Sequence, residues 1–367
     1  MMDTILTDRQ TDRQTDRQTD RQSYPLIDIF KFVFAIGVIA LHAHPLKDFS
    51  SFGDYMITQC FTRIGVPFFF VAAGYFLFSK MSIVNLDKER IKKYIVRLFR
   101  MLIVWTMIYM PIIMWDALHN NKGAIWGIGA KIYAFIVKGN AEFHLWFLHA
   151  LIIAVLLVSL FIKWGWTFRK IFLIAGMLHI IALLGGAYYF AYLFVFPEGS
   201  QVYEMLHGMT KYMKTTNGFT VGLLYVAIGA AICFSRPVLT KNYLYKGICI
   251  SWVLFIIEAS SIKILYPFIE GSTPYLFLIP TTIFTFLIGL KIKLKNKPVY
   301  MTMRKMSMFI YFLHPWFLVL VGAISKRIHP IDSLTNFIIV TILTLVTARL
   351  IVLRSNTNKN GLLAILG

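Results

Sequence analysis

The stretch LIDIFKFVFAIGVIALHAHP, residues 26–45, decides the fold class of this chain. Apart from Asp28 and Lys31 it is apolar as far as Leu41, and a helix of about 20 such residues crosses roughly 30 Å of hydrocarbon. The whole sequence is 58% hydrophobic, and only 15% of it is Asp, Glu, Lys or Arg. A soluble domain is roughly half apolar and a quarter charged. We therefore expect an all-α integral membrane protein.

Similar apolar blocks recur along the chain and predict about ten transmembrane helices. They lie near residues 26–43, 61–78, 97–115, 145–162, 171–194, 218–234, 247–265, 274–290, 307–325 and 335–353.

Lys and Arg concentrate in alternate connections between these blocks. The basic connections are Lys80 to Arg100, Lys163 to Lys170, Arg236 to Lys246 and Lys291 to Lys305. The positive-inside rule assigns such connections to the cytoplasm, so both termini are predicted to be cytoplasmic, as an even number of spans requires. The net charge of +20 thus orients the chain in the membrane and does not indicate binding to nucleic acid. The predicted location is the bacterial inner (cytoplasmic) membrane, as a multi-pass protein.

Three segments are expected. Residues 1–23 form a disordered tail, residues 24–354 the transmembrane domain, and residues 355–367 a short cytoplasmic tail. A short apolar stretch near 124–137 is predicted to be a re-entrant or interfacial piece rather than a further span.

The first tail reads TDRQ four times between residues 7 and 22. These four residues can be encoded by repeats of a single four-base unit, and such a tract changes length by slippage, which shifts the reading frame. We hypothesise that expression is phase-variable, as is typical of surface-modifying enzymes. Mixed codons in the gene would contradict this hypothesis, and the alternative is a tail without a role.

Lys31 and His42 lie on one face of the first predicted helix. Eleven steps of 100° make three turns plus about 20°, which places the two side chains roughly 16 Å apart along the axis. Asp28 lies one turn before Lys31. Ionisable residues inside a span are costly and usually face a cavity or a partner. Lys31 could instead snorkel to the interface beside Asp28, and His42 could be an interfacial histidine bonded to a backbone carbonyl.

The pair Lys31-x10-His42 resembles the Arg-x10-His signature of the acyltransferase-3 family of integral membrane acyltransferases. Further resemblances to family motifs follow in order between residues 24 and 350: RIGVPFFFVAAGY (63–75), HLWF (144–147), Asn217-Gly218 with Gly222 and Gly229, and Arg304 to Ser307 through Tyr311 and His314-Pro315. The chain also resembles the membrane half of membrane-bound serine racemases, although we expect it to carry neither a racemase domain nor an appended hydrolase-like domain. The family usually has arginine where this chain has Lys31, which keeps the charge but lacks the planar fork.

The resemblance implies transfer of an acyl group from acyl-CoA, most simply acetyl from acetyl-CoA, to a hydroxyl of a cell-surface or lipid-linked glycan. Such a reaction needs a base for the hydroxyl proton and positive charge near the developing oxyanion. His42 is the predicted base or, alternatively, a transient acyl carrier, because imidazole titrates near neutral pH. Arg63 is predicted to bind donor or acceptor oxygens, with an interfacial salt bridge as the alternative.

Other polar residues complete the predicted site. Glu258 lies within the apolar seventh block and is predicted to orient His42 or to pair with Arg63. Tyr311 and His314, like Asp28 and Lys31, are predicted to bind substrate or donor. The alternative for His314 is packing at the helix kink made by Pro315.

No metal is expected, because His144 and His149 are five residues apart and do not share a helix face. The predicted partners are the acyl-CoA donor, the glycan acceptor and the lipid bilayer. Two other functions remain open: a secondary transporter, and a sensor or uptake domain for a small solute such as an amino acid. A transporter predicts related halves with broken helices, and the sequence shows no convincing internal repeat.

Overall fold

The computed structural model of the protein describes residues 24–118, 144–188, 196, 199–205, 217–265 and 274–357. These residues form helices joined by turns, and the described part contains no strand. The predicted 1–23 tail, the apolar stretch near 124–137 and most of the 355–367 tail lie outside the described residues.

Each of the ten apolar blocks contains helix. In chain order the elements are α2 (Pro25–Ala43), α3 (Ser51–Tyr55), the π-helical η1 (Met56–Phe61), α4 (Gly65–Phe78), α5 (Lys88–Leu118), α7 (Trp146–Lys163), α8 (Phe168–Leu184), the π-helical η2 (Gly218–Gly222), α11 (Leu223–Ser235), α12 (Lys241–Leu265), α13 (Leu278–Lys291), α14 (Pro298–Arg327) and α15 (Ser333–Thr357).

Eight helical stretches in the described part are long and apolar enough to cross a membrane. Two of the ten predicted spans are shorter: α8 has 17 residues and α13 has 14. At 1.5 Å per residue, α13 covers only about 21 Å, because the chain before Leu278 runs through a non-helical turn. The prediction of an all-α integral membrane protein is confirmed. Of the ten predicted spans, eight correspond to helical stretches long enough to cross a membrane, and α8 and α13 are shorter.

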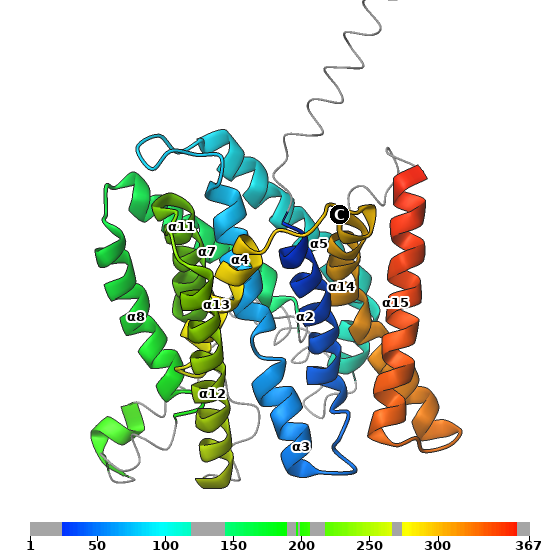
Figure 1. The fold of residues 1–367 in the computed structure, drawn as a ribbon. Coiled ribbons are helices and arrows are strands. Elements are labelled where there is room, and N and C mark those ends of the chain that lie inside the picture. Colours follow the sequence, from blue (N-terminus) through cyan, green and yellow to red (C-terminus); the bar gives the residue numbers. More distant parts are fainter. Residues whose placement is uncertain are drawn as a thin grey trace, which may run out of the picture.

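The helices run up and down, so the connections alternate between two ends of the bundle (Figure 1). All four basic connections lie at one end, which also holds the start of α2 and the end of α15. The positive charge is therefore gathered on one side, as the positive-inside rule requires. That this side faces the cytoplasm stays a prediction.

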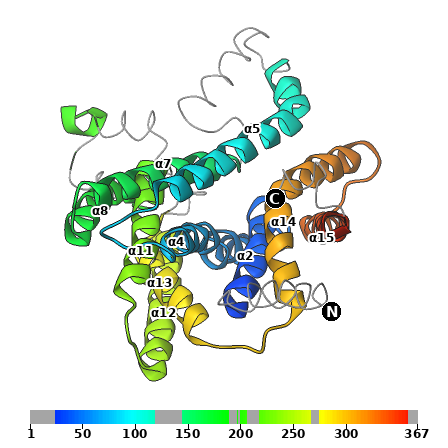
Figure 2. The ribbon, with the colours of Figure 1, turned by 90° about the horizontal axis from the view of Figure 1, so that it is seen from above.

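Viewed along the bundle, α2 and α4 lie near its middle (Figure 2). Helix α2 packs most extensively on α14, which in turn carries α15 at the periphery. On another side, α5 and α7 lie side by side, with α8 beyond them. The predicted face of α2 with Asp28, Lys31 and His42 is thus placed inside the bundle.

The pairing of α4 with α11 is the most extensive helix contact in the described structure. Glycines make it possible, because a Cβ atom at Gly74 would lie 2.3 Å from the Val226 carbonyl oxygen, and one at Gly229 would lie 2.1 Å from the Val71 carbonyl oxygen. Small residues let helix backbones approach closely in a membrane, where burial of apolar surface does not drive association.

We expect Gly229→Ala to destabilise the protein by about 1–3 kcal/mol, because α4 must move away to admit the methyl group. The measurement is the melting temperature of the detergent-solubilised protein. Gly176→Ala is the control, since no atom lies within 4 Å of a Cβ placed there on α8. Equal melting temperatures for the two variants would contradict the close contact.

Candidate active site

A cavity of about 1280 Å³ lies among α2, α4, α5, α7, α11, α12, α13 and α14, and residues of the basic connections, such as Lys80, Arg236 and Lys291, line it. Its described lining carries one carboxylate, Asp28, and eight cationic side chains. The cations are Lys31, Lys80, Arg90, Lys93, Arg97, Arg236, Lys291 and Arg304. The cavity is therefore suited to a polyanionic molecule.

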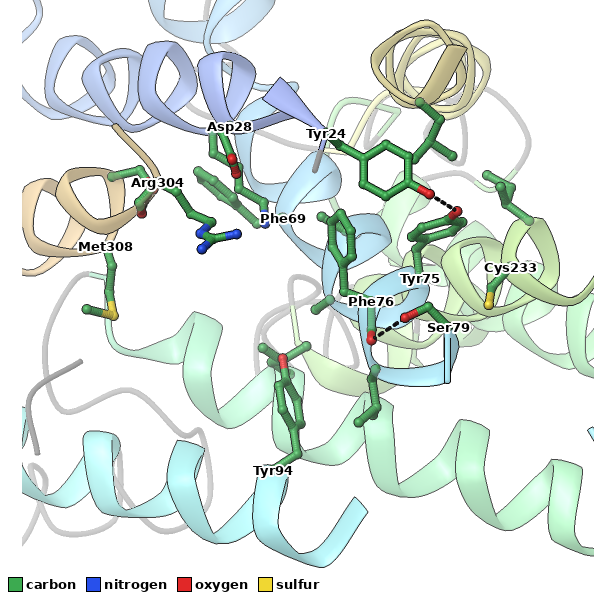
Figure 3. Close-up of a pocket in the computed structure, with 18 of the residues that line it drawn as sticks. Tyr24, Asp28, Phe69, Tyr75, Phe76, Ser79, Tyr94, Cys233, Arg304 and Met308 are labelled. Carbon is green, nitrogen blue, oxygen red and sulfur yellow. Dashed lines mark hydrogen bonds between the residues drawn. The ribbon is translucent and has the colours of Figure 1, made fainter. Parts of the chain in front are cut away.

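Asp28 and Lys31 line this cavity, as the shared helix face predicted. Asp28 is only 6% exposed and interacts electrostatically with Lys31 and with Arg304 of α14, which reaches into the same space (Figure 3). The Lys31 ammonium lies 4.8 Å from the centroid of the Phe76 ring, a cation–π contact. Lys31 therefore faces a protein cavity and interacts with Asp28 there.

Aromatic side chains from α7 and α14 line the same cavity on the side toward the opposite end of the bundle. Phe147, Tyr311 and Phe312 are among the lining residues, and the Phe147 and Tyr311 rings lie 5.7 Å apart. The Tyr311 hydroxyl donates a hydrogen bond to the backbone carbonyl of His144, just before α7. Tyr311 thus contacts both the cavity and the residue behind it.

Three histidines meet behind this aromatic wall. The rings of His42 and His314 are stacked, with centroids 5.4 Å apart, and the His144 ring lies 5.5 Å from that of His314. His314 is fully buried and His144 is 2% exposed. The structure therefore brings together the predicted residues His42 and His314, and it adds His144.

His144 was not among the predicted site residues, because its spacing from His149 speaks only to metal binding. The HLWF motif was the available signal, since it is one of the segments that carry the family resemblance. What the sequence could not show is that the start of α7 reaches the middle of α14. Among the described residues, no group of three or more His, Cys, Asp or Glu side chains is placed to hold a metal ion.

The loop after α2 holds the His42 end of that helix in place. His44 takes a left-handed conformation with φ 50°, and its Nδ1 lies 2.7 Å from an Asp54 carboxylate oxygen. Further along, the Asp48 carboxylate accepts a hydrogen bond of 2.7 Å from the Ser333 amide at the start of α15. These contacts fix the end of α2 against the α14–α15 hairpin, and so fix His42 beside His314.

Arg63 lies between the π-helical η1 and α4, and its guanidinium donates to the Gln59 side chain. It interacts electrostatically with His42 and with Tyr55 and Tyr275, whose hydroxyls are 2.9 Å apart. The predicted meeting of Arg63 with the end of the first helix is therefore supported. Single π turns often occur where a helix serves a functional site, and here one sets the direction of Arg63.

Glu258 occupies a different environment from the predicted one. One carboxylate oxygen accepts hydrogen bonds from the Tyr188 hydroxyl and the Leu276 amide, and the other accepts from the Phe277 amide at 2.8 Å. These three partners are neither His42 nor Arg63, so the predicted role of Glu258 toward those residues stays a prediction. The amides at the start of a helix lack partners within the helix and carry partial positive charge, so they attract a buried carboxylate.

The chain is similar to proteins of known families. The model of the acyltransferase-3 family, described as an acyltransferase domain, matches residues 24–353. A serine/alanine racemase of Enterococcus gallinarum is 28% identical over 87% of this chain and 44% of its own length. An amino-acid racemase of Enterococcus faecalis is 28% identical over 89% of this chain and 45% of its own length. The chain thus spans less than half the length of these relatives, and no solved structure matched it significantly.

We expect Glu258→Ala to lower the melting temperature, because it leaves the partly buried Leu276 and Phe277 amides, just before α13, without their charged acceptor, at a cost of about 1–3 kcal/mol. Glu258→Gln is expected to be intermediate, since its amide keeps one accepting oxygen. The exposed Glu204 provides the control, and Glu204→Ala should melt like the parent protein. Unchanged melting of Glu258→Ala would contradict the capping role.

Proposed function

Because this chain belongs to the acyltransferase-3 family of integral membrane acyltransferases, we propose that it moves an acyl group from acyl-CoA to a hydroxyl of a cell-surface or lipid-linked glycan. Acetyl-CoA is the simplest donor. The observation that carries the proposal is the arrangement of a basic cavity and a histidine cluster on the two sides of one aromatic wall.

The charges of the cavity support a CoA donor. CoA carries several phosphates at its nucleotide end, and Arg and Lys bind phosphate through charge-assisted hydrogen bonds. Arg97 of α5, Arg236 just after α11 and Arg304 of α14 face the same space. The pantetheine arm then extends past Lys31 toward Tyr311, where the thioester meets the histidines. Lys31 and Asp28 would position this arm at the inner end of the site.

The transfer needs no group beyond the side chains near His42. The acceptor oxygen attacks the thioester carbonyl carbon as His42 takes the hydroxyl proton, and the electron pair of the carbonyl moves to its oxygen. The carbonyl then re-forms as the C–S bond breaks, and the CoA thiolate takes the proton from His42 and leaves as the thiol. Arg63 supplies positive charge for acceptor or donor oxygens. In the alternative route His42 carries the acyl group before the acceptor does.

A glycan acceptor is supported by the position of His42 and Arg63 toward the end opposite the basic connections, where a surface molecule would approach. The bacterial sources of the relatives support a cytoplasmic membrane of bacteria as the location. The TDRQ repeat supports phase-variable expression, as expected of an enzyme that alters surface glycans.

The names of the relatives favour a second candidate, an uptake or sensing domain for an amino acid such as serine. The matched part covers less than half of those racemases, so their activity need not reside in it. Uptake of labelled serine into vesicles that contain the purified protein distinguishes this candidate from an acyltransferase.

Purified protein incubated with labelled acetyl-CoA and cell-envelope glycan is expected to transfer label to the glycan. His42→Ala should remove the activity, because the base or acyl carrier is lost, whereas His149→Ala on α7 should not. A wild-type protein that leaves the glycan unlabelled but moves serine into vesicles would overturn the proposal.

Arg304→Gln tests the donor cavity. We expect the KM for acetyl-CoA to rise about tenfold with little change in kcat, because one charge-assisted contact to the donor is lost in both the ground and transition states. Arg327→Gln, at the exposed other end of α14, is the control. An unchanged KM for Arg304→Gln would place the donor elsewhere.

A further inference from the structure

Both ring nitrogens of His144 are buried and have no hydrogen-bond partner among the residues that the structure describes. The side chain is 2% exposed, so bulk water does not satisfy them. Buried polar atoms without partners are rare, because no hydrogen bond within the protein compensates for the free energy lost when they leave water. Other buried atoms of described residues also lack a partner, but the His144 nitrogens lie beside His314 and Tyr311, next to the cavity, where a substrate group could reach them.

The hydrogen bond of His314 fixes which of its nitrogens carries the proton. Nδ1 lies 3.1 Å from the Ile310 carbonyl oxygen, which can only accept, so Nδ1 is the donor. In a neutral ring Nε2 then carries no proton and can only accept a hydrogen bond, and among the described residues this buried atom has no partner. His314 therefore offers an acceptor to the reaction centre and cannot donate from Nε2 without taking up a proton.

His144 is under no such constraint, because neither of its nitrogens is bonded to a carbonyl. A neutral imidazole has one N–H, and that of His144 is free to point to a substrate oxygen. Its ring also packs on the aromatic wall of the cavity, with centroids 5.3 Å from Tyr311 and 6.4 Å from Phe312. A thioester that reaches this wall from the cavity side therefore ends next to His144.

We propose that His144 is a third residue of the reaction centre and donates its ring N–H to the acyl carbonyl oxygen as negative charge develops there. The inference rests on the proposed function. As the acceptor oxygen bonds to the carbonyl carbon, His144 stabilises the oxyanion and His42 takes the hydroxyl proton. When the C–S bond breaks, the oxyanion returns its electron pair and releases the N–H of His144.

A comparison of two substitutions at one position separates hydrogen bonding from packing. His144→Phe keeps an aromatic ring beside Tyr311 but has no donor, whereas His144→Gln keeps an N–H. Loss of one oxyanion donor lowers kcat by about 10²–10³-fold, so we expect this loss for His144→Phe with the KM for acetyl-CoA nearly unchanged. His144→Gln should retain a rate within about tenfold of the wild type. His149→Phe, on α7, should have no effect.

The melting temperature in detergent shows whether each variant folds, and His144→Met against His144→Gln makes the same comparison if the Phe variant does not. A folded His144→Phe or His144→Met enzyme with wild-type kcat would overturn the inference. So would a folded Gln variant that is no faster than the variant without a donor. Absence of transfer by the wild type from acetyl-CoA would instead contradict the proposed function, and the role of His144 would fall with it.

Discussion

The high cost of leaving a polar group without a partner inside a membrane protein organises this structure. Asp28 meets two cations, Arg63 bonds Gln59, and Glu258 accepts hydrogen bonds from two amides and a tyrosine. Several buried polar atoms of the described residues are exceptions, and nitrogens of His144 and His314 are among them. We propose that at these two histidines a substrate supplies the missing partner.

Close helix packing makes these exceptions possible. The contacts at Gly74 and Gly229 bring α4 against α11, which holds one wall of the cavity, while α2 and α14 form another. We propose that the donor binds and the acyl group is transferred at different depths of the same bundle. Lys31 lines the cavity and His42 belongs to the histidine cluster, so α2 carries residues of both parts of the candidate site.

The sequence predicted the helices and much of the site because both follow from local patterns. Apolar blocks predict spans directly, and the spacing of Lys31 and His42 needs only the helical repeat. Pairing between distant helices has no such local signal. The sequence therefore showed neither that Glu258 would cap α13 nor that His144 would reach His314, and it did not show that α13 would be too short for a full span.

The central claim is that a CoA thioester enters from the basic end and meets the histidines at the aromatic wall. A cryo-electron microscopy structure with a non-hydrolysable acetyl-CoA analogue, in which a ketone replaces the thioester, tests it most directly. We expect the phosphates beside Arg97, Arg236 and Arg304, and the ketone oxygen within hydrogen-bonding distance of His144. An analogue bound outside this cavity, or with its ketone remote from all three histidines, would contradict the account.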